Sequence, residues 1–105
     1  MEIKFDKTYL EELYQTGKTT DKRYRFQPDI VKRYQARIKT LEKSSQVEDL
    51  FTISSLHYEV LKGDKKGISS IRVNDQYRIE FKTTQVVTET VLTVCDILEL
   101  SNHYK

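Results

Sequence analysis

Apolar residues recur at helical spacing in two stretches of the N-terminal half of the chain. The first stretch begins with Thr8 and Glu11 at the spacing of a capping box, and Gly17 supplies a stop. The second stretch, residues 28–43, begins with Pro28, which suits a first helical turn, and its apolar positions then recur at intervals of 3, 4 and 3. The pattern therefore predicts two helices.

Beyond residue 56 the helical period gives way to β-branched and aromatic residues, which indicates a sheet. Residues 1–5 alternate only weakly, which allows a brief additional strand before the first helix. The last strand is apolar at almost every position, so we expect it to be covered on both faces. The predicted fold is α+β, with two N-terminal helices packed on one face of a small, mostly antiparallel four-stranded sheet. The four predicted strands lie within residues 56–61, 68–73, 77–82 and 86–98.

The length of 105 residues corresponds to a single domain, residues 1–105. No apolar run approaches the roughly 20 residues that cross a bilayer, and the N-terminus lacks the hydrophobic segment of a signal peptide. We therefore expect a cytoplasmic protein without a membrane partner. The single cysteine, Cys95, has no neighbouring cysteine for a disulfide or zinc site, so neither a metal nor another cofactor is expected.

The net charge of +2 conceals an uneven distribution. Residues 18–43 carry a balance of +6 and residues 62–83 a balance of +3, while the rest of the chain sums to −7. If the two basic segments meet in space, they form a concentrated positive surface suited to a polyanion. The alternative is that these charges are simply solvated faces.

Strand parity places two arginines together. In residues 77–82, Arg78 and Glu80 alternate with apolar residues, and in residues 68–73 Arg72 does the same. Both arginines are therefore expected on the polar side of the sheet, opposite the helices, where they would form a shallow platform for an anion. The alternative is cross-strand pairing of an arginine with Glu80.

Two segments, LHYEVLKGD at residues 56–64 and SIRVNDQYRI at residues 70–79, carry a resemblance to a known family. They resemble the HigB-type toxins of the RelE/ParE superfamily, whose pattern is approximately L-H-x-L-K-G-D, W-S-I-R-V-N and W-R-I, with D-Y-H near the C-terminus. The resemblance is dense over residues 56–81 and looser over residues 95–105. It implies the RelE-like microbial ribonuclease fold and a toxin of the bacterial cytoplasm that cleaves mRNA in the 30S A site. It also implies a cognate antitoxin, which we expect to be a helix-turn-helix protein.

The resemblance assigns catalytic roles to residues that match the family motifs. Cleavage by the ribose 2′-hydroxyl needs a base, a cation for the extra phosphate charge and an acid for the leaving oxygen, and it needs no metal in principle. Arg78 matches the arginine that would stabilise this charge, with Arg72 beside it. His103 matches the terminal histidine, a general acid or base. Lys62 would contact phosphate or help activate the nucleophile, and Tyr104 would replace the family tyrosine.

Other residues are expected to contact RNA or the ribosome without taking part in the chemistry. His57 precedes the lysine turn and would orient RNA, and Gln76 occupies a polar turn position where a base contact is conceivable. The basic face of the second predicted helix offers a surface to ribosomal RNA. The predicted RNA contacts are His57, Gln76, Lys65 and Lys66, and the predicted ribosome contacts are Lys32, Arg33 and Arg37.

Three departures from the family pattern leave other functions open. Ser69 and Tyr77 stand where the family has tryptophans, and Asn102 stands where it has a tyrosine. Loss of an aromatic at Ser69 would alter the grip on a base. One alternative is a ParE-like inhibitor of DNA gyrase, which shares the fold. The other is a catalytically decayed relative that only binds an antitoxin.

Overall fold

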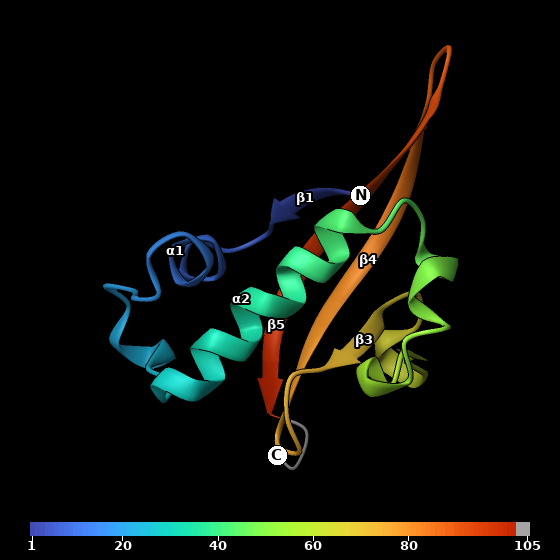
Figure 1. Cartoon of the computed structure of the whole chain (residues 1–105). Coiled ribbons are helices and arrows are strands. Elements are labelled where there is room, and N and C mark those ends of the chain that lie inside the picture. The colour runs from blue at the N-terminus through green and yellow to red at the C-terminus, as the bar shows by residue number, and fades with distance from the viewer. Residues whose placement is uncertain (103–105) are drawn as a thin grey trace.

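The computed structural model describes residues 1–102 and contains one five-stranded sheet, in the order β1-β5-β4-β3-β2 (Figure 1). The pairs β2–β3, β3–β4 and β4–β5 are antiparallel, and β1 pairs with β5 in parallel. The strands are β1 (Glu2–Phe5), β2 (Glu59–Val60), β3 (Ser69–Arg72), β4 (Tyr77–Val87) and β5 (Val91–Asn102). The helices are α1 (Thr8–Thr16) and α2 (Pro28–Lys43).

The prediction of a four-stranded sheet was therefore wrong, although the α+β class with two helices and a mostly antiparallel sheet is confirmed. The additional strand is β1, where Ile3 lies opposite Cys95. This pairing is parallel and joins the two ends of the chain, so the helices and the other strands together form the crossover that parallel strands require. A four-residue strand with weak alternation does not reveal such a distant partner.

The strand boundaries also differ from the prediction. Residues 56–61 form a strand only at Glu59–Val60, because Leu56 ends a 3-10 turn and His57 has a left-handed backbone with φ of 46°. Residues 86–98 are divided between the end of β4 and the start of β5. Along β5, Thr93, Cys95 and Ile97 are buried while the residues between them are only partly covered. The prediction that this strand is covered on both faces was therefore wrong.

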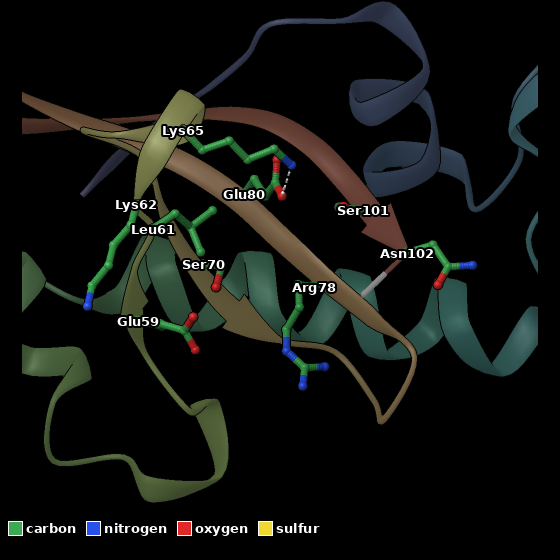
Figure 2. Close-up of a pocket in the computed structure, with 9 residues that line it drawn as sticks. All are labelled: Glu59, Leu61, Lys62, Lys65, Ser70, Arg78, Glu80, Ser101 and Asn102. Atoms are coloured by element: carbon green, nitrogen blue, oxygen red, sulfur yellow. Dashed lines mark hydrogen bonds and ion pairs between the residues drawn. The ribbon is translucent and has the colours of Figure 1, made fainter. Parts of the chain in front are cut away.

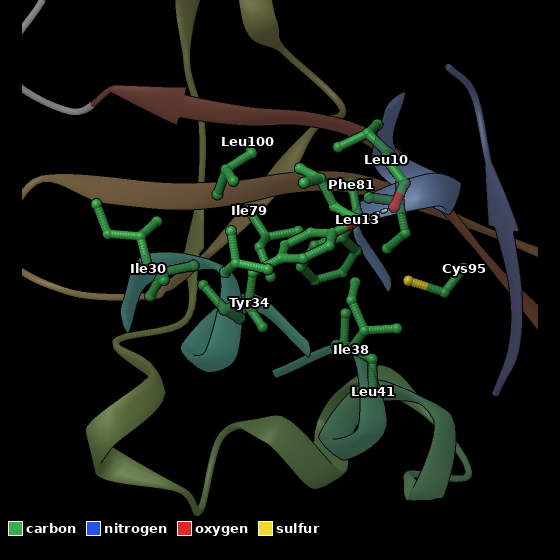
Figure 3. Packing of buried hydrophobic residues seen from close by; sticks show 14 of the residues in the cluster. Leu10, Leu13, Ile30, Tyr34, Ile38, Leu41, Ile79, Phe81, Cys95 and Leu100 are labelled. Atoms are coloured by element: carbon green, nitrogen blue, oxygen red, sulfur yellow. Dashed lines mark hydrogen bonds between the residues drawn. The ribbon is translucent and has the colours of Figure 1, made fainter. Parts of the chain in front are cut away.

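Helix α2 lies across one face of the sheet (Figure 1). Pro28 stands in its first turn, and its apolar stripe is buried as predicted. Figure 3 shows Tyr34 among the buried side chains of both layers, including Ile79 and Phe81. The Tyr34 hydroxyl donates a hydrogen bond of 2.8 Å to the Leu10 carbonyl, which ties α2 to α1. The long hairpin of β4 and β5 extends past α2, and its valines at 86, 87 and 91 are exposed.

Helix α1 packs at the β1–β5 edge of the sheet and not over its face (Figure 1). Its N-cap is Lys7 and no side chain caps it, so the predicted capping box is absent, whereas Gly17 ends the helix with φ of 78° as its spacing predicted. Beyond the end of β1, Tyr9 bonds the edge of β5, because its hydroxyl accepts the Leu100 N–H at 3.3 Å and donates to the Glu99 carboxylate. Helix α1 thus protects the edge of β5 that β1 is too short to cover.

No helix within residues 1–102 combines the length and apolar character needed to span a membrane.

Cys95 is fully buried in β5, and burial raises the pKa of its thiol to about 12. The thiolate is the reactive form of cysteine, so at pH 8 almost no reactive species is present in the folded protein. We expect the thiol to resist a colorimetric thiol reagent in native buffer and to react fully in denaturant. Rapid reaction of the native protein would contradict the packing of β1 against β5.

Candidate functional site

The face of the sheet opposite α2, called the open face here, carries the polar residues of the strands. Arg72 lies directly opposite Arg78 in the β3–β4 register, and Arg78 lies opposite Ser101 of β5. Directly opposed residues of antiparallel strands project to the same side. The register therefore places both arginines on one side of the sheet, as strand parity predicted.

A hollow of about 280 Å³ lies on the open face and gathers residues from four strands. Lys62 lies at one end of the hollow and Asn102 at the other, with Arg78 between them (Figure 2). Lys62 is exposed and precedes Gly63, whose φ of 67° turns the chain at a position where glycine is favoured. The lining residues are Glu59, Leu61, Lys62, Lys65, Ser70, Arg78, Glu80, Ser101 and Asn102.

The Arg78 guanidinium is held by backbone carbonyls and, in the described part of the chain, not by a carboxylate. Its Nη1 donates hydrogen bonds to the backbone carbonyls of Asn74 at 2.6 Å and Tyr77 at 3.1 Å. Within residues 1–102 no ion pair involves Arg78, although its charge is among those that lower the pKa of the nearby Asp75 carboxyl. The turn that provides these carbonyls is held by Asn74, whose Oδ1 accepts the N–H groups of Gln76 at 2.9 Å and Tyr77 at 2.7 Å.

Glu80 pairs with Lys65 and not with an arginine. The Lys65 Nζ lies 2.7 Å from Glu80 Oε2, and the Glu80 side chain is only 11% exposed. A carboxylate in so covered a position requires a partner. The predicted alternative, in which Glu80 neutralises an arginine of the platform, is therefore wrong in this structure, and Lys65 acts as a counter-ion at the site.

Arg72 lies on the same side of the sheet but outside the residues that line the hollow. Its Nη2 pairs with Asp75, whose side chain is 90% exposed, and its carbonyl accepts the Arg37 Nε at 3.0 Å. Burial, followed by the charges of Arg72 and Arg33, lowers the pKa of Arg37 from its usual value. Arginines of α2 and β3 therefore crowd together around the β3–β4 turn.

The structure divides the predicted basic face of α2. Lys32 and Arg33 are exposed, and Arg37 is half-buried against the β3–β4 turn. Gln35 turns the other way, because its Nε2 donates to the Leu13 carbonyl at 2.9 Å. The two basic segments therefore meet at one point, where Arg37 donates to the Arg72 carbonyl, while the concentrated positive surface expected from the charge distribution stays a prediction.

The remaining predicted residues are not gathered in the hollow. His57 lines a separate depression with Phe51 and Tyr58, and Tyr58 contacts the Ser69 hydroxyl at 2.8 Å. Gln76 is exposed in the β3–β4 turn, and Lys66 is exposed after the turn at residues 63–65. His103 and Tyr104, both predicted to be catalytic, lie outside the described residues.

A second hollow adjoins the first at the end of β5. It shares Lys65, Glu80, Ser101 and Asn102 with the first hollow. Its other walls include residues from the segment before α2, which the sequence presented as a polar, basic loop without a period. The members of that segment are Arg23, Tyr24 and Phe26. Their place beside the site depends on the path of the loop, and sequence pattern gives no signal for it.

Within residues 1–102 no group of three His, Cys, Asp or Glu side chains is arranged to hold a metal ion.

Comparison with known proteins points in one direction. The family model of RelE-like toxins of the type II toxin-antitoxin system HigB matches residues 3–94. Toxin HigB-1 of Vibrio cholerae is 34% identical over 83 residues, which cover 78% of this chain and 83% of that protein. A YoeB/ParE toxin from Agrobacterium tumefaciens is similar in fold, with a TM-score of 0.60 at 16% identity over 99% of this chain and 100% of that one.

Proposed function

This chain belongs to the family of RelE-like toxins of the type II toxin-antitoxin system HigB, and from that membership we propose that it is an endoribonuclease that cleaves mRNA at the ribosome. As a toxin of such a system it has an antitoxin as its partner. The observation that carries the proposal is Arg78, a positioned guanidinium that makes no ion pair within residues 1–102, on an open polar face. The family match does not favour the gyrase alternative.

The proposed reaction is attack by a ribose 2′-hydroxyl on the adjacent phosphate. The oxygen–phosphorus bond to the 2′-oxygen forms, the bond to the 5′-oxygen breaks, and the products end in a 2′,3′-cyclic phosphate and a 5′-hydroxyl. One proton leaves the 2′-hydroxyl and one joins the departing 5′-oxygen, which are the tasks of general base and acid. The chemistry needs only these proton transfers and stabilisation of the phosphate charge.

Each site residue has a proposed part in this reaction. Arg78 binds the non-bridging phosphate oxygens and stabilises their charge in the transition state. Lys62, at the other side of the hollow, contacts phosphate or favours loss of the 2′-proton. His103, the residue that follows Asn102 in the chain, moves a proton, because imidazole titrates near neutral pH. Tyr104 is proposed to take the catalytic role of the tyrosine in the family pattern.

Lys65 and Arg72 have supporting parts in the proposal. Lys65 is tied to Glu80 and raises the positive potential of the hollow less than an unpaired lysine would. Arg72 is tied to Asp75 and serves a phosphate beside the one that Arg78 binds. His57, Gln76 and Lys66 remain proposed RNA contacts outside the hollow.

We place the ribosome contact on the exposed basic side chains of α2. Replacing both Lys32 and Arg33 by glutamate is expected to weaken association with ribosomes and to lower the dependence of the affinity on salt, by about 0.7 to 0.9 in the logarithmic slope for each lost phosphate contact. Sedimentation with ribosomes at several salt concentrations measures both quantities. Lys4→Glu, at an exposed position on β1, serves as the control. An unchanged affinity in the double variant would show that this face is merely solvated.

Arg37 is a less suitable target for this test, although it belongs to the same proposed surface. Its Nε holds the Arg72 carbonyl, so its replacement would also disturb the β3–β4 turn.

Mapping of message ends tests the proposed function. Purified protein added to translating ribosomes is expected to produce new 5′ ends within the message, and the same message without ribosomes is expected to be cut far less. A cognate helix-turn-helix protein is expected to suppress the cuts. Absence of cuts together with gyrase-linked breaks in DNA would instead support the gyrase alternative, and absence of both would support a relative that only binds its antitoxin.

A further inference from the structure

The second hollow is walled by aromatic rings that neighbouring rings hold in place. The Tyr24 ring stacks on the Tyr9 ring with a centroid distance of 3.6 Å and an interplanar angle of 2°. The Phe26 ring meets the Tyr77 ring edge to face, at 5.4 Å and 82°. These contacts pack both loop aromatics against the core while leaving them at the wall of a hollow. The rings therefore offer a preformed surface.

The second hollow continues the proposed catalytic site. Ser101 and Asn102 line both hollows, and so do Lys65 and Glu80. In Figure 2, Asn102 stands at the end of the first hollow away from Lys62. A polymer with one phosphate at Arg78 and an extended course across the strands therefore reaches the second hollow at the end of β5.

The chemistry of the wall favours an unpaired nucleobase. Aromatic rings stack on any base, because every base has a π-face. The exposed Arg23 guanidinium lies 5.3 Å from the centroid of the Tyr24 ring and pairs with the Asp21 carboxylate at 2.8 Å, so its charge is already partly compensated. We propose that this hollow binds an unpaired base of the RNA strand, next to the phosphate held by Arg78, with Phe26 as the stacking surface and Tyr24, whose ring lies between Tyr9 and Arg23, as a fixed wall beside it.

This inference rests on the proposed function, but its test reads binding and not cleavage. The probes are two single-stranded oligonucleotides of equal length in which 2′-deoxyribose prevents cleavage, one carrying adenine bases and one abasic. The wild-type protein is expected to bind the base-containing probe about tenfold or more tightly than the abasic probe in fluorescence anisotropy. Phe26→Leu is expected to lose most of this difference while binding the abasic probe as the wild type does.

Phe51→Leu is the matched control, because Phe51 is an aromatic residue with 58% exposure in the separate depression near His57. It is expected to preserve the full difference between the probes. Thermal unfolding checks that each variant is folded, because Phe26→Leu also removes the edge-to-face contact with Tyr77.

Three results would overturn the inference: equal binding of both probes by the wild type, an unchanged difference in folded Phe26→Leu, or loss of antitoxin binding in Phe26→Leu with RNA binding intact. The last result would show that the hollow is a binding site for the antitoxin. If base-dependent binding is found but no message is cut, the proposed function fails while the base site stands.

Discussion

Replacing Arg78 by alanine is expected to reduce the rate of message cleavage by about 100- to 1,000-fold, the usual cost of removing one donor that stabilises a developing negative charge. The loss should fall on the rate of cleavage by bound ribosomes more than on the affinity, because the charge on the phosphate grows in the transition state. Single-turnover cleavage on programmed ribosomes separates the two quantities.

Two variants control this result. Arg78→Lys keeps a charge but loses the bidentate geometry, so it is expected to recover only part of the rate. Arg72→Ala is expected to cost less, because Arg72 already pairs with Asp75 and lies outside the lining of the hollow. Cleavage by Arg78→Ala at nearly the wild-type rate, or a larger loss in Arg72→Ala, would remove Arg78 from the centre of the mechanism.

Replacing Tyr34 by alanine is expected to lower the free energy of unfolding by about 3 to 5 kcal/mol, since the change empties a large volume in the core between α2 and the sheet. Tyr34 is fully buried and its hydroxyl is bonded to the Leu10 carbonyl. Tyr34→Phe keeps the ring and removes only the hydrogen bond to the Leu10 carbonyl, so we expect a loss of about 0.5 to 1.5 kcal/mol.

Urea unfolding followed by circular dichroism measures both changes. Because domains of this size are stable by only about 5 to 15 kcal/mol, the alanine variant is expected to be partly unfolded at 37 °C. A loss below about 1 kcal/mol for Tyr34→Ala would contradict the position of Tyr34 in the core. Equal losses in the two variants would show that the hydroxyl, and not the ring, accounts for the stability.

The sequence was most informative where contacts are local. Helix α2 was predictable because its buried stripe repeats at helical intervals and Pro28 suits its first turn. The alternation of residues 1–5 allowed strand β1, but its parallel pairing was not predictable because its partner is β5, at the other end of the chain. The bend at His57 and the length of the β4–β5 hairpin were missed for a different reason, since apolar runs give strand character without strand limits.

The site divides in the same way. Strand parity was enough to place Arg72 and Arg78 on one side of the sheet, and the resemblance to the family motif singled out Lys62, which precedes the turn at Gly63. The sequence pattern could not indicate that Lys65 forms an ion pair with Glu80, because that contact depends on how the turn at residues 63–65 lies over β4. Nor could it bring Tyr24 and Phe26 to the end of β5, since the basic loop that carries them has no period.

The central claim is that the open face cleaves RNA through the ribose 2′-hydroxyl, and the chemistry of the new ends tests it most directly. Fragments from ribosome-bound message are treated with a ligase that accepts only 5′-hydroxyl ends and, in parallel, with an enzyme that accepts only 5′-phosphate ends. The account predicts 5′-hydroxyl ends paired with 2′,3′-cyclic phosphates, all formed far more slowly with Arg78→Ala. Cuts that carry 5′-phosphates would mean that water attacked the phosphate, and they would contradict it.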